Sequence, residues 1–240
     1  MDFNKILNNG VTITSSGTTG TPKEIFRTPE NLKACNEIAI DAQKLTSKSR
    51  VLTVTRMTHA GGLLTQSLPA YTLGAELKIQ QFNPYTFLKD FQGYTHTFLT
   101  PAHMKALVNT KGFKDSNLTG KFVLGGSDPV DWDLIYKFVY QGATVMPNWG
   151  MSEIGPITIN TTFDDLFQVL HYKHVLKGEF ILGDCVYCDI KIIDNELYVR
   201  GSICYQEGWL ATGDLVESIG KLFSYKGRKR RVSGLAPKTL

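Results

Sequence analysis

Hydrophobic and polar positions change period along the first two-thirds of the chain. Short apolar or β-branched runs predict strands at VTIT (11–14), VLTVT (51–55), GAELKIQ (74–80), THTFLT (95–100), KFVLGG (121–126) and ATVMPNW (143–149). Between them, apolar residues recur at helical spacing, which predicts helices that begin near Thr28, Pro101 and Val130. Alternation of strands and helices is typical of the α/β class, so we predict a largely parallel sheet flanked by helices.

The segment at residues 28–45 gives the clearest helix signal. Thr28 is a suitable N-cap, and Pro29 is favoured at the first helical position. The apolar positions that repeat along one face are Leu32, Cys35, Ile38, Ala39, Ala42 and Leu45.

The pattern changes after about residue 176. The runs GEFIL (178–182), VYCDIKIID (186–194) and ELYVRG (196–201) predict strands with no helix between them. Asp194-Asn195 is expected to form a hairpin turn. A small β-rich subdomain therefore follows the α/β part.

Polar or glycine-rich segments come directly after four of the predicted strands. These are SSGTTGTPK, RMTHAGG, GGSDP and NWGMSE. In a parallel sheet, the segments that follow strands lie along one edge, where open α/β folds bind ligands. We therefore expect the four segments to converge on one site.

Composition narrows the class of protein. The 240 residues are 42% hydrophobic, which is enough for a core, and no apolar run approaches the length of a membrane span. The first ten residues lack a secretory pattern and four cysteines are too few for a disulfide scaffold, so we expect a reduced, cytoplasmic chain. The net charge of +4 comes from KGRKRR (226–231), and we do not expect nucleic-acid binding.

The first polar segment has the chemistry of a phosphate-binding loop. Its glycines let the backbone turn with exposed amides, its hydroxyls donate hydrogen bonds, and its lysine adds a positive charge. A flexible surface loop is the alternative, but the complete string ending in Pro-Lys favours phosphate. The candidate phosphate-binding residues are Thr14, Ser15, Ser16, Gly17, Thr18, Thr19, Gly20 and Lys23.

The string TSSGTTGTPK resembles the signature loop of the adenylate-forming superfamily, which includes acyl- and aryl-CoA synthetases, nonribosomal adenylation domains and firefly luciferase. The resemblance implies that ATP activates a small carboxylic acid as an acyl- or aryl-adenylate with release of pyrophosphate. Transfer to a thiol, with coenzyme A as co-substrate, commonly follows in that family. The loop would hold the β- and γ-phosphates, with Lys23 as a catalytic residue.

NWGMSEIGP is similar to the family motif Y-G-x-T-E. The resemblance implies that Trp149 offers a flat face to adenine and Ser152 a hydroxyl to the α-phosphate. Glu153 would hold Mg²⁺, which prefers carboxylate and phosphate oxygens, and would be catalytic. The remaining residues of the motif that would border the nucleotide are Asn148, Gly150 and Met151.

Two further segments resemble nucleotide-binding motifs of the family. GGSDP is similar to the loop that lines the adenine pocket, which implies close approach at Gly125, Gly126 and Ser127. GWLATGDL resembles G-W-x-x-T-G-D, which implies that Asp214 accepts hydrogen bonds from both ribose hydroxyls.

RMTHAGGLL is similar to the loop in which a histidine or aromatic residue borders the carboxylate site. His59 would be a catalytic residue there, and Gly61 with Gly62 would leave room for the acyl or aryl group. The alternative is a structural histidine.

KGRKRR begins like the family hinge G-R-x-x-D, which implies that Arg228 contacts the nucleotide, although Arg230 and Arg231 stand where an acidic residue is expected. Family members carry a longer N-terminal segment and a C-terminal lid with a catalytic lysine, whose motif Lys238 does not match. We expect an α/β nucleotide- and carboxylate-binding core at 1–175, a β-rich subdomain at 176–225 and a hinge stub at 226–240.

Four alternatives stay open at this length: a minimal enzyme, one part of an enzyme divided over two chains, a shortened chain, and a relative that binds ATP or AMP without turnover. In each case we expect a homodimer or a complex with a separate lid-domain protein, because one side of the core would otherwise be uncovered.

Overall fold

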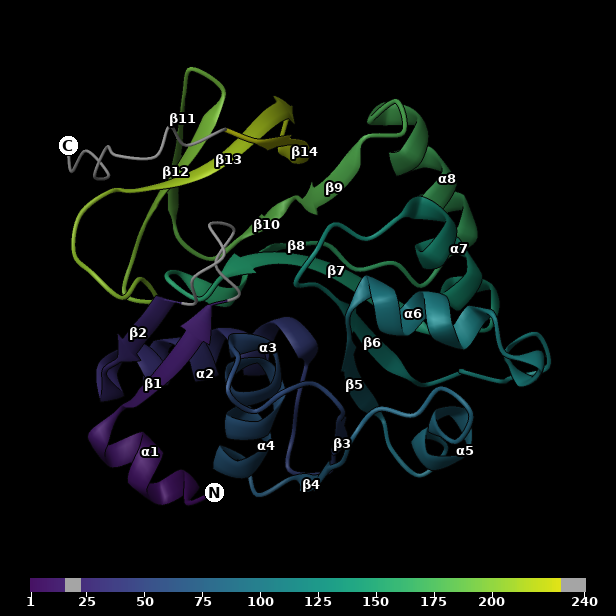
Figure 1. Ribbon diagram of the computed structural model, residues 1–240. Helices are drawn as coiled ribbons and strands as arrows, with labels where there is room; N and C mark the ends of the chain where they lie inside the picture. Colours follow the sequence, from purple (N-terminus) through teal and green to yellow (C-terminus); the bar gives the residue numbers. More distant parts are fainter. Residues whose placement is uncertain (16–22, 230–240) are drawn as a thin grey trace.

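The computed structural model describes residues 1–15 and 23–229, and its strands form three sheets (Figure 1). The largest has seven strands in the order β10-β8-β7-β6-β5-β3-β4. Their bounds are β3 (Arg50–Thr53), β4 (Glu76–Ile79), β5 (His96–Leu99), β6 (Phe122–Gly125), β7 (Thr144–Met151), β8 (Gly155–Asn160) and β10 (Cys185–Val186). The strands from β4 to β7 pair in parallel, whereas β8 and β10 join in antiparallel fashion. The predicted α/β fold with a largely parallel sheet is confirmed.

Helices cover both faces of this sheet. One face carries α2 (Pro29–Gln43), α3 (Ala60–Gly62), the π-helical turn η1 (Leu63–Ser67) and α4 (Leu68–Thr72). The other carries α5 (Phe87–Phe91), α6 (Pro101–Val108), α7 (Trp132–Tyr140) and α8 (Leu166–Val175). The short elements α1 (Phe3–Asn9) and η2 (Lys111–Phe113) add to these layers: Ile6 of α1 packs into the cluster of the first face, and Phe113 of η2 packs into that of the second.

Strand alternation explains why both faces are apolar. In β6, Val123 packs into the cluster of α5 to α8, while the next residue, Leu124, packs under α2. In β7, Val145 likewise packs into the cluster of α5 to α8, and Met146 packs into the cluster under α2. Successive side chains of a strand point to opposite faces, so an unbroken apolar run fits a sheet that is buried on both sides.

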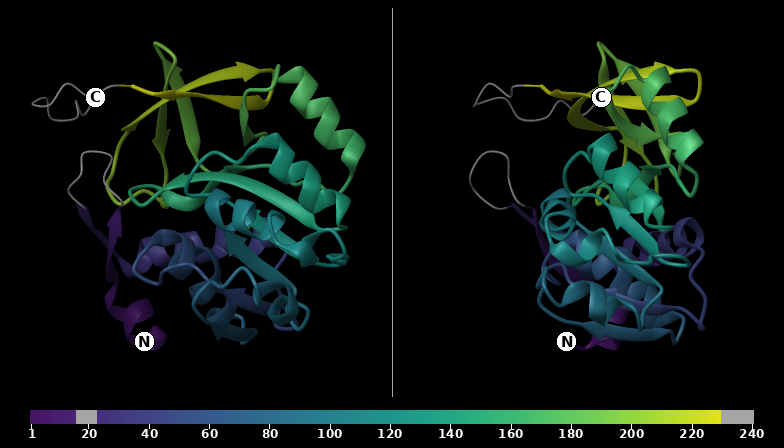
Figure 2. Two further views of the ribbon diagram at one scale, coloured as in Figure 1. Left: turned by 45° about the vertical axis from the view of Figure 1, so that its right-hand side comes forward. Right: turned by 90° about the vertical axis from the view of Figure 1, so that its right-hand side faces the viewer.

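The second sheet is antiparallel and has the order β11-β12-β13-β14-β9. Its strands are β9 (Phe180–Gly183), β11 (Asp189–Ile193), β12 (Glu196–Arg200), β13 (Leu210–Ile219) and β14 (Leu222–Arg228). Asp194 and Asn195 have φ of 50° and 63°, as the predicted hairpin turn requires. The sheet packs against the end of β7 and β8 through a separate apolar cluster (Figure 2). Strand β14 extends to Arg228, three residues into the range expected for a hinge stub.

Helix α2 forms as its sequence predicts. The Thr28 side chain accepts a hydrogen bond from the Asn31 amide at 3.3 Å, and Pro29 begins the helix. The first amides of a helix have no partner within it, so the missing amide hydrogen of Pro29 costs no helical hydrogen bond. Lys44, in the left-handed region with φ of 55°, ends the helix.

The first strand belongs to neither large sheet. β1 (Val11–Ser15) pairs with β2 (Lys23–Arg27) as an antiparallel hairpin that places Ser15 opposite Lys23. The expectation that SSGTTGTPK follows a strand of the parallel sheet is therefore wrong. The strand predicted at 143–149 also runs further than expected, because Gly150 and Met151 are part of β7.

Within residues 1–15 and 23–229, no helix combines the length and apolarity needed to cross a membrane.

Candidate functional site

Segments far apart in the sequence meet around one cleft of about 670 Å³. They are the β1–β2 hairpin, the segments after β3, β4, β5 and β6, the end of β7 with its following turn, the start of β8, and the end of β14. The residues predicted to form the site that line the cleft are Ser15, Lys23, His59, Gly61, Gly62, Ser127, Asn148, Gly150, Met151, Ser152, Glu153 and Arg228.

Other predicted residues lie behind the cleft wall or outside the described part of the chain. Thr14, Gly125, Gly126, Trp149 and Asp214 are not among the lining residues. Ser16, Gly17, Thr18, Thr19, Gly20, Thr21, Arg230, Arg231 and Lys238 lie outside the described residues.

The hairpin is fastened to the segment after β3. The Thr14 amide donates to the carbonyl of Thr58 at 3.1 Å, and Nδ1 of His59 lies 2.9 Å from the Thr14 carbonyl oxygen. A carbonyl oxygen can only accept, so Nδ1 of His59 carries the hydrogen. In the neutral form of His59, Nε2 is then the nitrogen that can accept a hydrogen bond. His59 lines the cleft.

Two positions after β3 have no room for a side chain, because other atoms approach them closely. A Cβ at Gly62 would lie 2.5 Å from the Arg56 carbonyl oxygen, a backbone atom that cannot move aside. A Cβ at Gly61 would lie 2.9 Å from the ring of Phe98, which also lines the cleft. Glycine at these positions therefore permits close packing against the Arg56 backbone and the Phe98 ring, and the room that it would leave for an acyl or aryl group stays a prediction.

The segment after β6 contacts the end of β7. The Asn148 side-chain amide donates to the Gly125 carbonyl at 2.9 Å, and a Cβ at Gly126 would lie 2.8 Å from that same amide. These contacts hold the Gly125-Gly126 backbone against β7 and place Ser127 at the cleft.

A tight turn follows β7 and presents Ser152 and Glu153 to the cleft. The Ile154 amide donates to the Met151 carbonyl at 3.0 Å, which closes the turn. No group of three or more His, Cys, Asp or Glu that could hold a metal occurs in residues 1–15 and 23–229. One carboxylate at Glu153 is a suitable donor set for Mg²⁺, because this ion commonly takes one or two protein carboxylates and completes its shell with phosphate oxygens and water.

Trp149 and Asp214 meet beneath the cleft. Trp149 is only 9% exposed, and its indole Nε1 donates to Oδ2 of Asp214 at 2.9 Å. Nε of Arg228 lies 3.2 Å from the other oxygen, Oδ1. Burial raises the pKa of the Asp214 carboxyl, although Arg228 and the indole hydrogen bond oppose that shift. Adenine stacking on Trp149 and ribose binding by Asp214 stay predictions.

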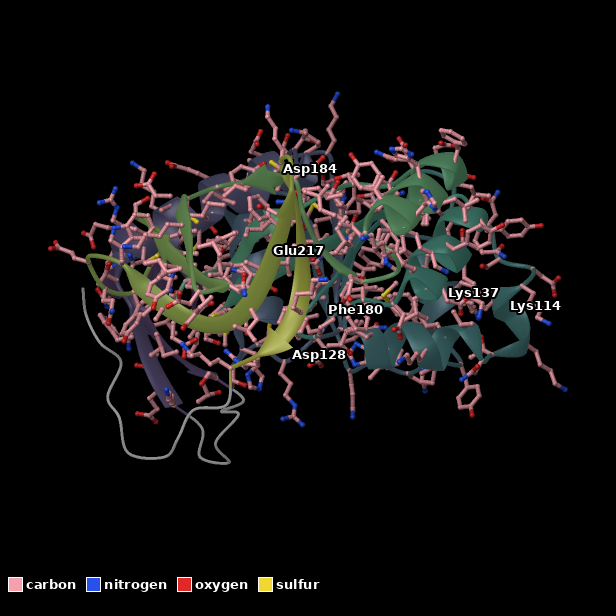
Figure 3. All side chains as sticks on the ribbon, turned by 90° about the horizontal axis from the view of Figure 1, so that it is seen from above. Lys114, Asp128, Lys137, Phe180, Asp184 and Glu217 are labelled. Atoms are coloured by element: carbon pink, nitrogen blue, oxygen red, sulfur yellow. The ribbon has the colours of Figure 1, made fainter. Side chains whose placement is uncertain are left out.

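Sequence patterns missed several residues of the cleft wall. Thr100 and His103 follow β5, and Phe82 stacks on His103 with ring centroids 4.1 Å apart. Phe82 follows the parallel strand β4, so the rule that segments after parallel strands line the site would have found all three residues. Asp128 of the GGSDP segment also lines the cleft and lies beside the yellow strands of the second sheet in Figure 3.

Known proteins share both the sequence pattern and the fold. Residues 10–213 match the family model described as AMP-binding enzyme. The chain is 28% identical over 190 residues to the acyl-CoA synthetase FUM10 of Gibberella moniliformis, covering 76% of this chain and 33% of that protein. It is 24% identical over 249 residues to the indoleacetate–CoA ligase of Aromatoleum aromaticum, covering 91% of this chain and 47% of the ligase.

Solved structures share the fold at low sequence identity. The inhibitor-bound N-terminal domain of FACL13 from Mycobacterium tuberculosis superposes with a TM-score of 0.76 at 17% identity, covering 90% of this chain and 60% of that one. An adenylation domain of a keto acid-selecting NRPS module, bound to keto acyl adenylate, gives 0.78 at 16%, covering 92% and 52%. The chain spans less than half the length of the two curated relatives named above.

Proposed function

Because the chain belongs to the AMP-binding enzyme family, we propose that it binds ATP in the cleft and activates a carboxylic acid as an acyl- or aryl-adenylate. Pyrophosphate is the second product. Transfer of the acyl group to the thiol of coenzyme A is the step that we propose to follow, since the curated relatives named above are an acyl-CoA synthetase and a CoA ligase.

One observation carries the proposal. The cleft is lined from one side by Ser15 and Lys23, from another by His59, and from a third by Ser152 and Glu153. These are the side chains that a nucleotide triphosphate and a carboxylate require: hydroxyl and ammonium donors, an imidazole, and a carboxylate for a metal ion. Chance would not be expected to gather them from segments as far apart in the chain as Ser15 and Glu153.

The reaction joins a carboxylate oxygen of the acid to the α-phosphorus of ATP. The bond from the α-phosphorus to the bridging oxygen breaks, and pyrophosphate leaves with the electron pair. We assign Lys23 to the departing phosphates, Ser152 to the α-phosphate and His59 to the acid. Mg²⁺ held by Glu153 would supply charge neutralisation when bound. The protein then acts mainly by positioning and by preorganised electrostatics.

We assign the acid to the part of the cleft bounded by His59, Gly61, Phe98 and His103. The Phe82–His103 stack gives this part a flat aromatic wall, which supports either an acyl or an aryl group as the occupant. The division into a core, a β-rich subdomain and a hinge, and association with a second copy or a lid-bearing protein, stay proposals.

ATP–pyrophosphate exchange over a panel of acyl and aryl acids tests the proposed function. We expect exchange that depends on the acid and on Mg²⁺, and that is lost in Glu153→Gln. Asp133→Asn is the control, because Asp133 is an exposed partner of Lys137 on α7 and does not line the cleft.

ATP binding without exchange for any acid would instead favour a nucleotide-binding module. A melting temperature that ATP with Mg²⁺ does not change would overturn both functions, because any ligand of the folded state must stabilise it.

A further inference from the structure

Arg27 is a buried cation beside the candidate metal turn. It is the last residue of β2, the strand that leaves the candidate phosphate loop at Lys23. Residues 23, 25 and 27 share one face of the strand, and along this face burial increases from exposed Lys23 to Ile25 and then Arg27, which has 0% of its surface exposed. The strand thus carries one lysine at the cleft and one guanidinium in the interior.

The guanidinium holds the backbone on both sides of Glu153. Nη1 of Arg27 donates to the Ser152 carbonyl at 3.1 Å, and Nη2 lies 3.5 Å from the Ile154 carbonyl. The carbonyl between them, that of Glu153, accepts from the Tyr205 amide at 2.9 Å. Three consecutive carbonyls of this turn are therefore held by other parts of the chain.

The segment that supplies Tyr205 depends on the same guanidinium. Nη2 of Arg27 also donates to the carbonyl of Ile203. Asn31, four residues further along, donates to the carbonyls of Ser202 and Cys204 at 2.8 and 2.9 Å. The turn at Glu153 and the segment at 202–205 are therefore held together through one short stretch of chain.

No carboxylate of the described residues forms an ion pair with Arg27. Its charge is balanced by carbonyl dipoles and by a hydrogen bond to Sγ of Cys35 at 3.1 Å, and within residues 1–15 and 23–229 its Nε has no partner. Burying an unpaired cation is costly, and apolar residues commonly replace such groups without loss of stability. The rigid planar fork is the property that an apolar residue would not supply.

We propose that Arg27 is a positioning residue, which fixes the backbone of the Ser152–Ile154 turn so that the Glu153 carboxylate meets the metal–triphosphate complex. This inference rests on the proposed function, because it concerns how Glu153 engages Mg²⁺ and ATP. It also links two parts of the site, since the strand that bears Lys23 is the one that orients Glu153.

Calorimetric titration with ATP tests the inference. The measured quantity is the ratio of the ATP dissociation constant in EDTA to that in Mg²⁺, called here the magnesium gain. Loss of a group that orients a metal ligand commonly costs roughly 10–100-fold in metal affinity, so Arg27→Lys is expected to reduce the magnesium gain by about tenfold or more. Affinity in EDTA should change less than affinity in Mg²⁺, because without the metal only the contact assigned to the Ser152 hydroxyl depends on this turn.

A double-mutant cycle separates positioning from a general structural role. In a Glu153→Gln background the carboxylate is absent, so Arg27→Lys should cause no further loss of magnesium gain. Lys121→Met is the matched control: Lys121 is a buried cation, 8% exposed, that donates to the carbonyls of Gln92 and Tyr94 at 2.8 and 2.7 Å, away from the cleft. It should lower the melting temperature and leave the magnesium gain unchanged.

The outcomes are distinguishable. If the wild-type chain shows a magnesium gain and Arg27→Lys keeps it, this inference alone is overturned. The same conclusion follows if Arg27→Lys lowers the magnesium gain equally in the wild-type and Glu153→Gln backgrounds. A wild-type chain whose ATP affinity does not respond to Mg²⁺ would overturn the proposed function together with it. If Arg27→Lys does not fold, Asn31→Ala, which releases the 202–205 segment from α2, should reduce the magnesium gain in the same direction, and an unchanged gain would contradict the inference.

Discussion

Nε1 of Trp149 lies 2.9 Å from Oδ2 of Asp214, and this hydrogen bond joins the two large sheets. Trp149 belongs to β7 of the largely parallel sheet, whereas Asp214 belongs to β13 of the antiparallel sheet. An indole N–H can only donate, so it holds one carboxylate oxygen while Arg228 holds the other. The orientation of a candidate ribose-binding carboxylate is thus determined by residues from both sheets.

Trp149→Phe removes this donor while keeping an aromatic ring. A buried acceptor that loses its partner costs about 1–3 kcal/mol, so we expect the free energy of unfolding to fall by that amount. ATP affinity should also fall, because the freed carboxylate can rotate. Urea denaturation and calorimetry measure the two effects. Trp209→Phe is the control: Trp209 immediately precedes β13, its ring contacts Lys191 and Arg200, and its replacement should leave ATP affinity unchanged.

As the pH rises through the titration of Asp214, its contribution to stability should decrease while its contribution to nucleotide binding should increase. Burial is the main cause that raises the pKa of this carboxyl in the folded state. The folded chain then binds the proton more tightly than the unfolded chain, so the contribution of Asp214 to stability decreases as the pH rises from its unfolded-state pKa through its folded-state pKa. In the predicted binding mode the ribose hydroxyls donate to the ionised form, so we expect nucleotide binding to strengthen over the same interval.

We therefore expect ATP affinity to fall on acidification at a higher pH than an exposed aspartate would give. Asp214→Asn should weaken binding at neutral pH and remove most of this pH dependence. Titration calorimetry from neutral to acid pH measures both, with adenosine as the ligand because the phosphates of ATP and AMP themselves ionise in this range. Asp189→Asn, an exposed partner of Arg200, should keep the wild-type profile.

Gly61→Ala should narrow the part of the cleft assigned to the acid. The added Cβ would lie 2.9 Å from the Phe98 ring, and Phe98 is only 2% exposed, so the contact has little room to relax. Overpacking of this kind commonly costs about 1–3 kcal/mol. We expect a higher KM for the acid in pyrophosphate exchange and a nearly unchanged KM for ATP.

Gly112→Ala is the control for this variant, because a Cβ there meets no atom within 4 Å. Equal changes in the two KM values for Gly61→Ala would contradict the assignment of the acid to this part of the cleft.

Local signals in the sequence predicted the elements that depend on local physics. Thr28 and Pro29 began α2 as expected, and the Asp194-Asn195 turn joined β11 to β12. Strand β2 was not predicted, because the residue that it buries most deeply, Arg27, is polar by any hydropathy scale. Its burial depends on carbonyls more than a hundred residues away, which no local pattern contains.

Part of the candidate site also follows from local signals in the sequence. Segments after β3 and β6 lie where the rule for parallel sheets requires, and His59 and Ser127 line the cleft. Trp149 is more buried than the prediction implied, because its indole bonds to Asp214, a residue on another sheet. Pairing between sheets is a tertiary property, and the sequence indicated only that both residues belong to recognisable motifs.

The β1–β2 hairpin separates the candidate phosphate-binding loop from the start of a helix. Lys23 begins a strand, and α2 begins only at Pro29, beyond that strand. Many phosphate loops lead directly into a helix and use the partial positive charge of its macrodipole. Here an exposed ammonium takes that place, and an exposed charge is screened over about 10 Å at 0.1 M salt. The electrostatic part of phosphate capture by this hairpin therefore varies with the ionic strength of the medium.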